Sequence, residues 1–349
     1  METKIVKIDK DNIDEDVINE AGLIIKNGGL VAFPTETVYG LGGDALNKNS
    51  SKKIYEAKGR PSDNPLIVHI ADIGDIEKIA IDVPPITYEL AKRFWPGPLT
   101  MILKKAECVP LETTGGLDTV AIRYPSNPIA QKFIKASGGF VAAPSANRSG
   151  KPSPTEGKYV IEDMDSLIEM IIDGGSSDIG LESTIIDLTS DEPMILRPGF
   201  VTKEDFLNVI ENVSIDRTIL DSSSGAKPKA PGMKYRHYAP SGELTIIHGE
   251  PKDVVAYINE EVSRYKAQGQ KTGIIATKEN SGYYRADVIK EIGNRDDDES
   301  IARNLFRILR EMDDENVKVI FSEGFREEGI AMATMNRLLK AAGHKEVRV

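Results

Sequence analysis

The sequence predicts a two-domain α/β protein, with a twisted, open, mixed sheet in the N-terminal part and a small parallel, Rossmann-like sheet in the C-terminal part. Its 349 residues favour two domains over one. In the first 200 residues, short apolar runs alternate irregularly with helical stretches, whereas after Ser241 strands and crossover-length helices alternate regularly. We therefore expect domains at residues 1–215 and 242–349, joined by a linker or lid at 216–241.

The strands of the first domain are predicted from apolar runs that stop at a proline or are rich in β-branched residues. These runs are residues 30–33, 120–124, 140–143 and 184–188. The clearest helix is 14–26, because its apolar residues fall on one face and Gly28-Gly29 ends it. Further helices are expected at residues 49–58, 86–94 and 128–136.

The second domain is predicted from a regular alternation of strands and helices, which is typical of a parallel sheet. Its strands are expected at residues 244–248, 272–277 and 317–322, with a short one at 287–289. Its helices are expected at 251–266, 300–312 and 329–341, with Ser300 as the N-cap of the second. No G-x-G-x-x-G follows the first of these strands, so nothing supports a dinucleotide site.

The segment 221–241 has the composition of a linker, with Ser, Gly, Pro and Lys and no apolar periodicity. Its second half nevertheless carries side chains that favour burial: Met233, Tyr235, His237 and Tyr238. A docked linker and a lid over a binding site both fit these residues.

Composition excludes several classes of protein. No apolar run approaches the roughly 20 residues that cross a bilayer, and the mixed-charge start of the chain is unlike a signal peptide. Cys108 is the lone cysteine, so neither an intramolecular disulfide nor a cysteine-rich zinc site can form. These features predict a cytoplasmic location. A net charge of -11 also argues against non-specific binding of nucleic acid, although it is compatible with a local basic pocket.

The motifs of several common sites are absent from the sequence. It has no G-x-x-x-x-G-K-[ST] phosphate loop and no G-x-S-x-G nucleophile elbow. Its four histidines are too scattered for a zinc motif. Any nucleotide chemistry must therefore use another set of residues.

Two polar segments follow predicted strands early in the chain. In 33–43, two threonine hydroxyls and a carboxylate precede glycines that would let a backbone approach a ligand, although a tight turn capped by threonine fits as well. In 58–69, Lys58 and Arg60 could hold a triphosphate, or could be solvated charges on a loop. His69 ends an apolar run, where a histidine is more often a core residue than a ligand contact.

Two more polar segments lie further along the chain. Residues 143–153 combine hydroxyl and amide groups with a glycine and two cations, which suits an anion-binding loop or an ordinary polar loop. Ser183 precedes a strand and Arg197 ends one, so both could face a site or simply be polar strand ends. All four segments lie near strand ends, where open α/β sheets bind ligands, and none pairs a nucleophile with a base. This pattern favours positioning and charge stabilisation, as in phosphoryl or nucleotidyl transfer.

Seven motifs follow one another in the chain: PTETVYGLGGDA, KGRPSDNPLIVHI, FWPGPLT, VAIRYP, APSANRSGKPSPT, ESTIIDL and LRPG. In this order they resemble the motifs of the YrdC-type threonylcarbamoyl-AMP synthases, over about residues 10–205. The segment APGMKYRHYAP is similar to the linker that joins this domain to a Rossmann-like domain in the long form of that family. The resemblance implies a YrdC-like fold for the first domain.

The resemblance also implies a nucleotidyltransferase that makes L-threonylcarbamoyl-AMP, diphosphate and water from L-threonine, bicarbonate and ATP, with Mg²⁺ carried by ATP and no metal held by protein side chains. It implies threonine contacts at Thr37, His69, Arg123, Ala143 and Ser183. It implies ATP contacts at Arg60, Asn64, Thr119, Ser145, Ser153, Arg197 and a linker tyrosine, Tyr235 or Tyr238. Lys58 and Arg60 would stabilise charge at the phosphates during the reaction.

The product would feed a tRNA threonylcarbamoyl transferase that forms N6-threonylcarbamoyladenosine in tRNAs reading ANN codons. Two other classes stay open on the residues alone. An RNA-binding module without chemistry is disfavoured by the net charge and by the lack of aromatics interleaved with basic residues. A carbamoyl transferase is disfavoured because YrdC-like domains of that kind sit in much larger chains with zinc-finger regions.

Overall fold

The computed structural model describes residues 2–216 and 237–349, and the chain divides into two compact units. The first unit comprises Met1–Ser149, Ser153–Asp178 and Glu182–Lys234, and the second comprises Gly150–Pro152, Ile179–Leu181 and Tyr235–Val349. Most of the expected linker, 216–241, lies outside the described residues, so its limits stay a prediction.

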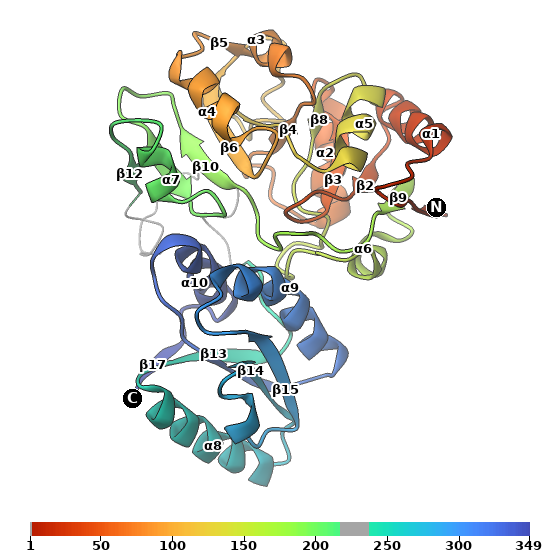
Figure 1. Cartoon of the computed structure of the whole chain (residues 1–349). Helices are drawn as coiled ribbons and strands as arrows, with labels where there is room; N and C mark the ends of the chain where they lie inside the picture. The colour runs from red at the N-terminus through yellow and green to blue at the C-terminus, as the bar shows by residue number, and fades with distance from the viewer. Residues whose placement is uncertain (1, 217–236) are drawn as a thin grey trace. The chain divides into compact units, whose positions relative to one another are not determined.

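The first unit is built on one twelve-stranded mixed sheet, with strand order β1-β9-β2-β3-β8-β4-β7-β6-β10-β11-β12 and with β5 paired to β6 (Figure 1). The strands are β1 Lys4–Lys7, β2 Val31–Phe33, β3 Gly40–Asp44, β4 Ile67–His69, β5 Ala80–Ile81, β6 Leu99–Lys105, β7 Thr119–Arg123, β8 Val141–Ala142, β9 Met170–Asp173, β10 Thr184–Asp187, β11 Met194–Arg197 and β12 Ser214–Ile215. The helices are α1 Glu15–Lys26, α2 Lys48–Lys58, α3 Ile76–Ile79, α4 Ile86–Phe94, α5 Pro128–Ala136, α6 Gly157–Met164 and α7 Lys203–Leu207. The mixed α/β fold expected for this part of the chain is confirmed.

Helices α1 and α5 show why these segments fold as they do. Asp14 caps α1 by accepting hydrogen bonds from two backbone N–H groups of its first turn, and Asn127 does the same for α5, where Pro128 occupies the first helical position. The two helices lie side by side in Figure 1. A Cβ at Gly22 would come within 2.5 Å of the Ala136 carbonyl oxygen, so glycine permits this close approach.

The glycine-rich segment after β2 differs from expectation. Residues Gly40–Asp44 form strand β3, which pairs antiparallel with β2 and with β8. A Cβ at Gly42 would lie 2.9 Å from Val141 Cγ1, and one at Gly43 would lie 3.0 Å from Ile54 Cδ1. These two glycines therefore serve close packing inside the first unit, and an approach of their backbone to a ligand stays a prediction.

The second unit contains a five-stranded sheet of order β15-β14-β16-β13-β17, in which every recorded strand pair is parallel. Its elements are β13 Glu243–His248, α8 Pro251–Ala267, β14 Thr272–Thr277, β15 Val288–Gly293, α9 Asp298–Asp314, β16 Val319–Glu323, α10 Gly329–Ala341 and β17 Glu346–Arg348. In Figure 1, α8 lies on one face of this sheet, and α9 and α10 lie on the other. The Rossmann-like parallel sheet is confirmed.

The start of α9 corrects the predicted N-cap. The cap is Asp297, whose side chain accepts a hydrogen bond from the Ser300 backbone N–H at 3.0 Å. Ser300 is already inside the helix, and its hydroxyl donates to the Asp297 carbonyl oxygen. Aspartate and serine are both good caps, and a run of four acidic residues before Ser300 left the choice of first helical residue ambiguous.

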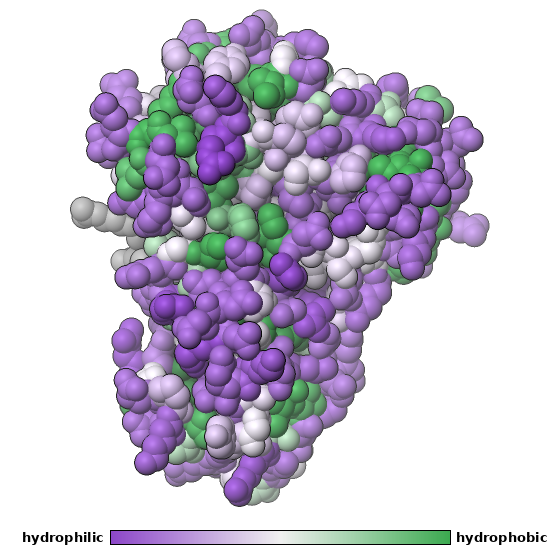
Figure 2. All heavy atoms as spheres, viewed as in Figure 1, coloured by the Kyte–Doolittle hydropathy of each residue, from purple (hydrophilic) through white to green (hydrophobic). Residues whose placement is uncertain are grey.

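The face of the molecule drawn in Figure 2 is mostly polar. Figure 2 shows hydrophilic residues over most of the visible face, with hydrophobic residues in smaller, separate patches. Of the helices in residues 2–216 and 237–349, none is both long and apolar enough to cross a membrane.

Candidate functional site

Two predicted contact residues, His69 and Arg123, are neighbours at one edge of the first sheet. β4 and β7 run parallel, and His69 is the register partner of Arg123 at their carboxyl ends. The carboxyl ends of strands are where open α/β sheets place their ligands. Ala143 follows β8, which pairs antiparallel with β4, so it lies beside the amino end of β4, where its backbone N–H donates to the Ile67 carbonyl oxygen at 2.9 Å.

The neighbouring strands add two hydroxyl groups to this edge. Thr100 of β6 is the register partner of Arg123 across the β6–β7 pair. Its Oγ1 atom lies 2.7 Å from Ser183 Oγ, just before β10 begins. Arg197 donates to the Ser183 carbonyl oxygen through Nε and to the Ser183 hydroxyl through Nη2, each at 3.0 Å. The polar strand ends therefore form a connected buried network.

Arg123 forms a buried ion pair with Glu36. Arg123 Nη2 lies 2.7 Å from Glu36 Oε1, and the two side chains are 5% and 6% exposed. Within the part of the chain that the structure describes, Glu36 Oε2 and Arg123 Nε are buried and make no hydrogen bond. The sequence indicated Arg123 but not its partner, although Glu36 stands in the PTETVYG motif.

Thr35 and Thr37, which flank Glu36, bond locally. Thr35 Oγ1 donates to the Val38 carbonyl oxygen at 2.6 Å and lies 2.9 Å from Thr37 Oγ1. The Thr37 backbone N–H donates to Thr35 Oγ1 at 3.2 Å. These bonds match the threonine-capped turn that we left open, and they fix the backbone that carries Glu36.

His69 is buried and neutral. Burial, followed by the positive charge of Arg123, lowers the pKa of His69 to about 3. Its ring meets the Phe33 ring edge-on, with centroids 6.0 Å apart. The residue is thus both a core histidine and a neighbour of the Arg123 ion pair, so the two readings of His69 do not exclude each other.

Lys58 and Arg60 lie on either side of Gly59, the left-handed residue that ends α2. Lys58 is only 2% exposed, so it is not a solvated charge. Its Nζ atom donates to the carbonyl oxygens of Ser145 and Asn147, each at 2.5 Å, and so holds the 145–147 loop against the end of α2. Arg60 is half-buried, and its Nη2 atom donates to the carbonyl oxygens of Asn64 and Pro65.

The other predicted ATP contacts lie at several places in the first unit. Ser145 Oγ donates to Asn147 Oδ1 at 2.5 Å, which places it on the loop that Lys58 holds. Ser153 Oγ donates to Glu182 Oε1 at 2.7 Å. Thr119 begins β7, which Arg123 ends, so about 13 Å of strand separates the two. Glu182 is a polar neighbour of Ser153 that the sequence alone did not single out.

The linker tyrosines are described only in part. Tyr235 lies outside the described residues. Tyr238 belongs to the second unit, is 5% exposed, and packs on Phe306 with ring centroids 5.0 Å apart. A contact of either tyrosine with a nucleotide stays a prediction.

No group of three or more His, Cys, Asp or Glu side chains in residues 2–216 and 237–349 is arranged to hold a metal ion.

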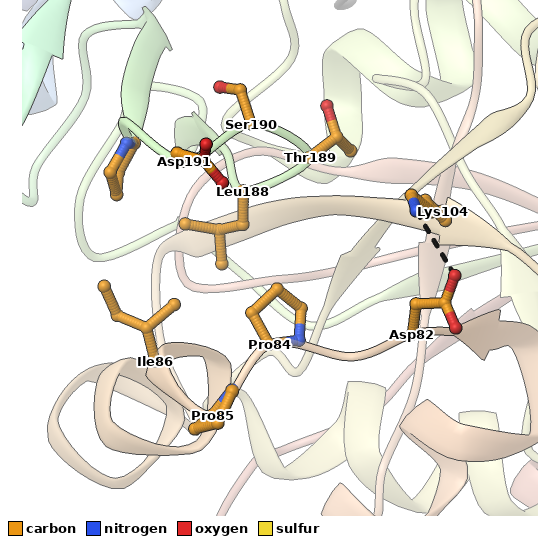
Figure 3. Close-up of a pocket in the computed structure, with 10 residues that line it drawn as sticks. Asp82, Pro84, Pro85, Ile86, Lys104, Leu188, Thr189, Ser190 and Asp191 are labelled. Carbon is orange, nitrogen blue, oxygen red and sulfur yellow. Dashed lines mark hydrogen bonds and ion pairs between the residues drawn. The ribbon is translucent and has the colours of Figure 1, made fainter.

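A cavity of about 390 Å³ occurs in the first unit, away from the candidate site. Figure 3 shows Pro84, Pro85 and Ile86 on one side of it, facing Leu188, and the Asp82–Lys104 ion pair at its edge. None of the predicted site residues lines this cavity, so it is separate from the candidate site.

Two family models match the chain. The Sua5/YciO/YrdC model, described as telomere recombination, matches residues 23–199, and the threonylcarbamoyl-AMP synthase C-terminal domain matches residues 201–343. Between them they cover most of both units.

Relatives of known name match nearly the whole chain. A threonylcarbamoyl-AMP synthase of Pyrococcus abyssi is 50% identical over 97% of this chain and 98% of its own. One of Bacillus subtilis is 47% identical over 95% and 94%. The solved structure of P. abyssi Sua5 complexed with L-threonine superposes with a TM-score of 0.93 at 48% identity, covering 99% of this chain and 100% of that one.

Proposed function

The chain belongs to the Sua5/YciO/YrdC family of threonylcarbamoyl-AMP synthases, and from this premise we propose that it condenses L-threonine, bicarbonate and ATP into L-threonylcarbamoyl-AMP, diphosphate and water. The observation that carries the proposal is the buried polar edge formed by His69, Arg123 and Ser183. This edge brings together the guanidinium of Arg123, the neutral imidazole of His69 and the hydroxyl group of Ser183.

The amino acid would bind at this edge. Arg123 is fixed by Glu36 and offers a guanidinium for a carboxylate. The Ser183 hydroxyl and the Thr37 hydroxyl suit the polar groups of a small hydroxy amino acid, and Ala143 would contribute its backbone. The neutral imidazole of His69 adds no charge to compete with Arg123 for the carboxylate.

ATP would bind along the segments that Lys58 ties together. Arg60 and Asn64 lie in the segment that follows α2, and Ser145 lies on the loop that Lys58 holds. Arg197, which is bonded to Ser183, would be a further contact. Asn64 Oδ1 is buried and accepts no hydrogen bond within the described residues, so an ATP amino or hydroxyl donor would satisfy it. Thr119, Ser153 and a linker tyrosine complete the proposed set.

The reaction needs protection from water and stabilisation of phosphate charge. Threonine's amine would attack bicarbonate or carbon dioxide, and the resulting carbamate is short-lived in water, so a dry site favours its use. The carbamate oxygen would then attack the α-phosphorus in line, with diphosphate leaving. Lys58, Arg60 and Arg197 supply fixed positive charge for the phosphate oxygens, and Mg²⁺ would arrive with ATP.

We further place the enzyme in the cytoplasm, where its product would pass to a transferase that modifies the tRNAs that read ANN codons. The lone Cys108, which is exposed, fits a reducing compartment. Direct tRNA binding is not part of the proposal, because a net charge of -11 opposes it.

The proposed reaction is tested by measuring diphosphate release from ATP with each of the three substrates omitted in turn. We expect release only when L-threonine and bicarbonate are both present. Equal ATP turnover without threonine would refute the substrate assignment, and no turnover under any condition would refute the reaction.

Arg60→Ala should lower kcat/KM for ATP at least about tenfold, because a charge-assisted contact to phosphate is lost while the half-buried side chain contributes little to the core. Lys58→Ala should lower turnover and also the unfolding temperature, because Lys58 Nζ holds the 145–147 loop. Diphosphate release and thermal unfolding of both variants check this. An active Arg60→Ala enzyme would remove Arg60 from the site.

A further inference from the structure

The Glu36–Arg123 pair contains one unused acceptor and one unused donor. A single hydrogen bond of 2.7 Å joins the two side chains. Glu36 Oε2 and Arg123 Nε are both buried and without a partner in residues 2–216 and 237–349. The bond thus satisfies the two charged groups only in part.

Such a pair is expensive to bury. Two ions lose their hydration, and only excellent geometry with further hydrogen bonds offsets that loss. Each buried polar atom left without a bond costs about 1–3 kcal/mol more, and a charged one costs at the upper end. An α-amino acid has the two groups that the pair lacks, because its carboxylate accepts from a guanidinium and its ammonium donates to a carboxylate.

We propose that Glu36 binds the α-ammonium group of the amino-acid substrate while Arg123 binds its carboxylate, so that the buried ion pair recognises a zwitterion. This inference rests on the proposed function and names the recognition element of the same site. The ammonium donates to Glu36 Oε2 and the carboxylate accepts from Arg123 Nε, while the bond between Glu36 Oε1 and Arg123 Nη2 is kept.

The charges around the pair support this assignment. In an α-amino acid the ammonium group and the carboxylate are attached to the same carbon. Arg123 alone would therefore repel the ammonium group of a substrate whose carboxylate it binds, and Glu36 supplies the compensating negative charge. His69, the register partner of Arg123, is neutral and neither repels nor replaces the ammonium. Thr35 and Thr37 are bonded to each other, and the turn that carries Glu36 is held in place by the bond from Thr35 Oγ1 to the Val38 carbonyl oxygen.

The test compares two ligands on two proteins. One ligand is L-threonine, and the other is the 2,3-dihydroxybutanoate of matching configuration, in which a hydroxyl replaces the α-ammonium. Binding to the full chain is measured by calorimetry without ATP. Glu36→Gln should weaken threonine binding by between about ten- and one-hundred-fold, because a charged hydrogen bond is lost, while the Kd of the analogue changes less than about threefold.

Two further variants separate recognition from folding. Glu36→Asp keeps the charge on a shorter side chain and should recover part of the preference for threonine over the analogue. Glu169→Gln changes another carboxylate of the first unit, which accepts from the Leu30 backbone N–H at 2.7 Å, and should leave that preference unchanged.

The inference is overturned if Glu36→Gln weakens both ligands equally, which would make the ion pair structural, or if it changes neither Kd. Failure of the wild-type chain to bind threonine would also overturn it. The readout needs no turnover, so a chain that selects threonine through Glu36 but releases no diphosphate would refute the proposed reaction and leave the ammonium site standing.

Discussion

The burial of His69 fixes its charge and so makes folding sensitive to pH. Desolvation first, and then Arg123, lowers the pKa of His69 from 6.5 to about 3 in the folded chain. Between these two values the unfolded chain binds a proton that the folded chain does not, so the free energy of unfolding falls as the pH falls below about 6.5. The lost stability amounts to about 2 kcal/mol at pH 5 from this group alone.

Replacing His69 by glutamine should therefore make unfolding of the first unit less dependent on pH. The fall in the free energy of unfolding between pH 7 and pH 5 should be about 2 kcal/mol smaller in His69→Gln than in the wild type. Urea denaturation at the two pH values measures it. The matched control is His344→Gln at an exposed position. An equal fall in wild type and His69→Gln would mean that His69 is protonated in the folded chain.

At the residue scale, the sequence identified cations and hydroxyl groups better than it identified their partners. Arg123, His69 and Ser183 could be predicted as contacts because their motifs resemble those of the YrdC-type synthases, whereas the residues alone left a structural role open for His69 and Ser183. Glu36 and Thr100 could not be assigned from the residues, since their contacts cross between segments 87 and 83 positions apart. The burial of Lys58 was equally hidden, because the loop that accepts its hydrogen bonds lies 87 positions away.

At the element scale, the N-cap of α9 is a local contribution to stability that can be measured directly. Asp297→Ala should lower the free energy of unfolding of the second unit by about 1 kcal/mol, because the Ser300 backbone N–H loses its acceptor. Ser300→Ala should cost less, since its hydroxyl only donates to the Asp297 carbonyl oxygen. Urea unfolding followed by circular dichroism compares the two. A larger loss in Ser300→Ala would contradict the assignment of the cap.

Strand β3 shows a second effect at this scale, because its neighbours leave no room for a side chain at Gly42. Gly42→Ala should destabilise the first unit by about 1–3 kcal/mol, because its Cβ would crowd Val141 Cγ1 and the Val31 carbonyl oxygen. Gly282→Ala is the control, since a Cβ there meets nothing within 4 Å. Thermal unfolding gives both values. A neutral Gly42→Ala variant would show that β3 can move away from its neighbours.

Local signals explain which elements could be predicted. The helices Ile86–Phe94 and Pro128–Ala136 were predicted at their observed ends, because apolar periodicity or a capped proline marks them. β3 is not among the predicted strands, because four of its five residues, other than Leu41, are glycines or an aspartate, which strands rarely use. Its strand character comes from pairing with β2 and β8, and no local pattern carries that information.

At the scale of the whole molecule, the two units are not simply consecutive in the chain. Gly150–Pro152 and Ile179–Leu181 belong to the second unit, although the residues around them belong to the first. Within the second unit, Arg310 of α9 is 2% exposed and donates to the Pro152 carbonyl oxygen through Nε at 3.0 Å and Nη2 at 2.7 Å. A boundary placed at a single linker cannot represent this arrangement.

A fragment of residues 237–349 should nevertheless fold alone, because all five strands of its sheet and the core around Ile274 and Phe321 lie in this segment. We expect cooperative urea unfolding of the fragment at a lower midpoint than for the same unit in the full chain. Hydrogen exchange of the sheet amides in the two proteins measures the difference.

The lower stability of the fragment should trace to Arg310. Arg310→Met should cost about 1.5–3 kcal/mol in the full chain, where two charged donors lose the Pro152 carbonyl, and much less in the fragment, which lacks that acceptor. Ile274→Ala is the control and should cost about 2–5 kcal/mol in both, because its core lies wholly within the fragment. Equal losses from Arg310→Met in the two proteins would show that Pro152 does not stabilise the second unit.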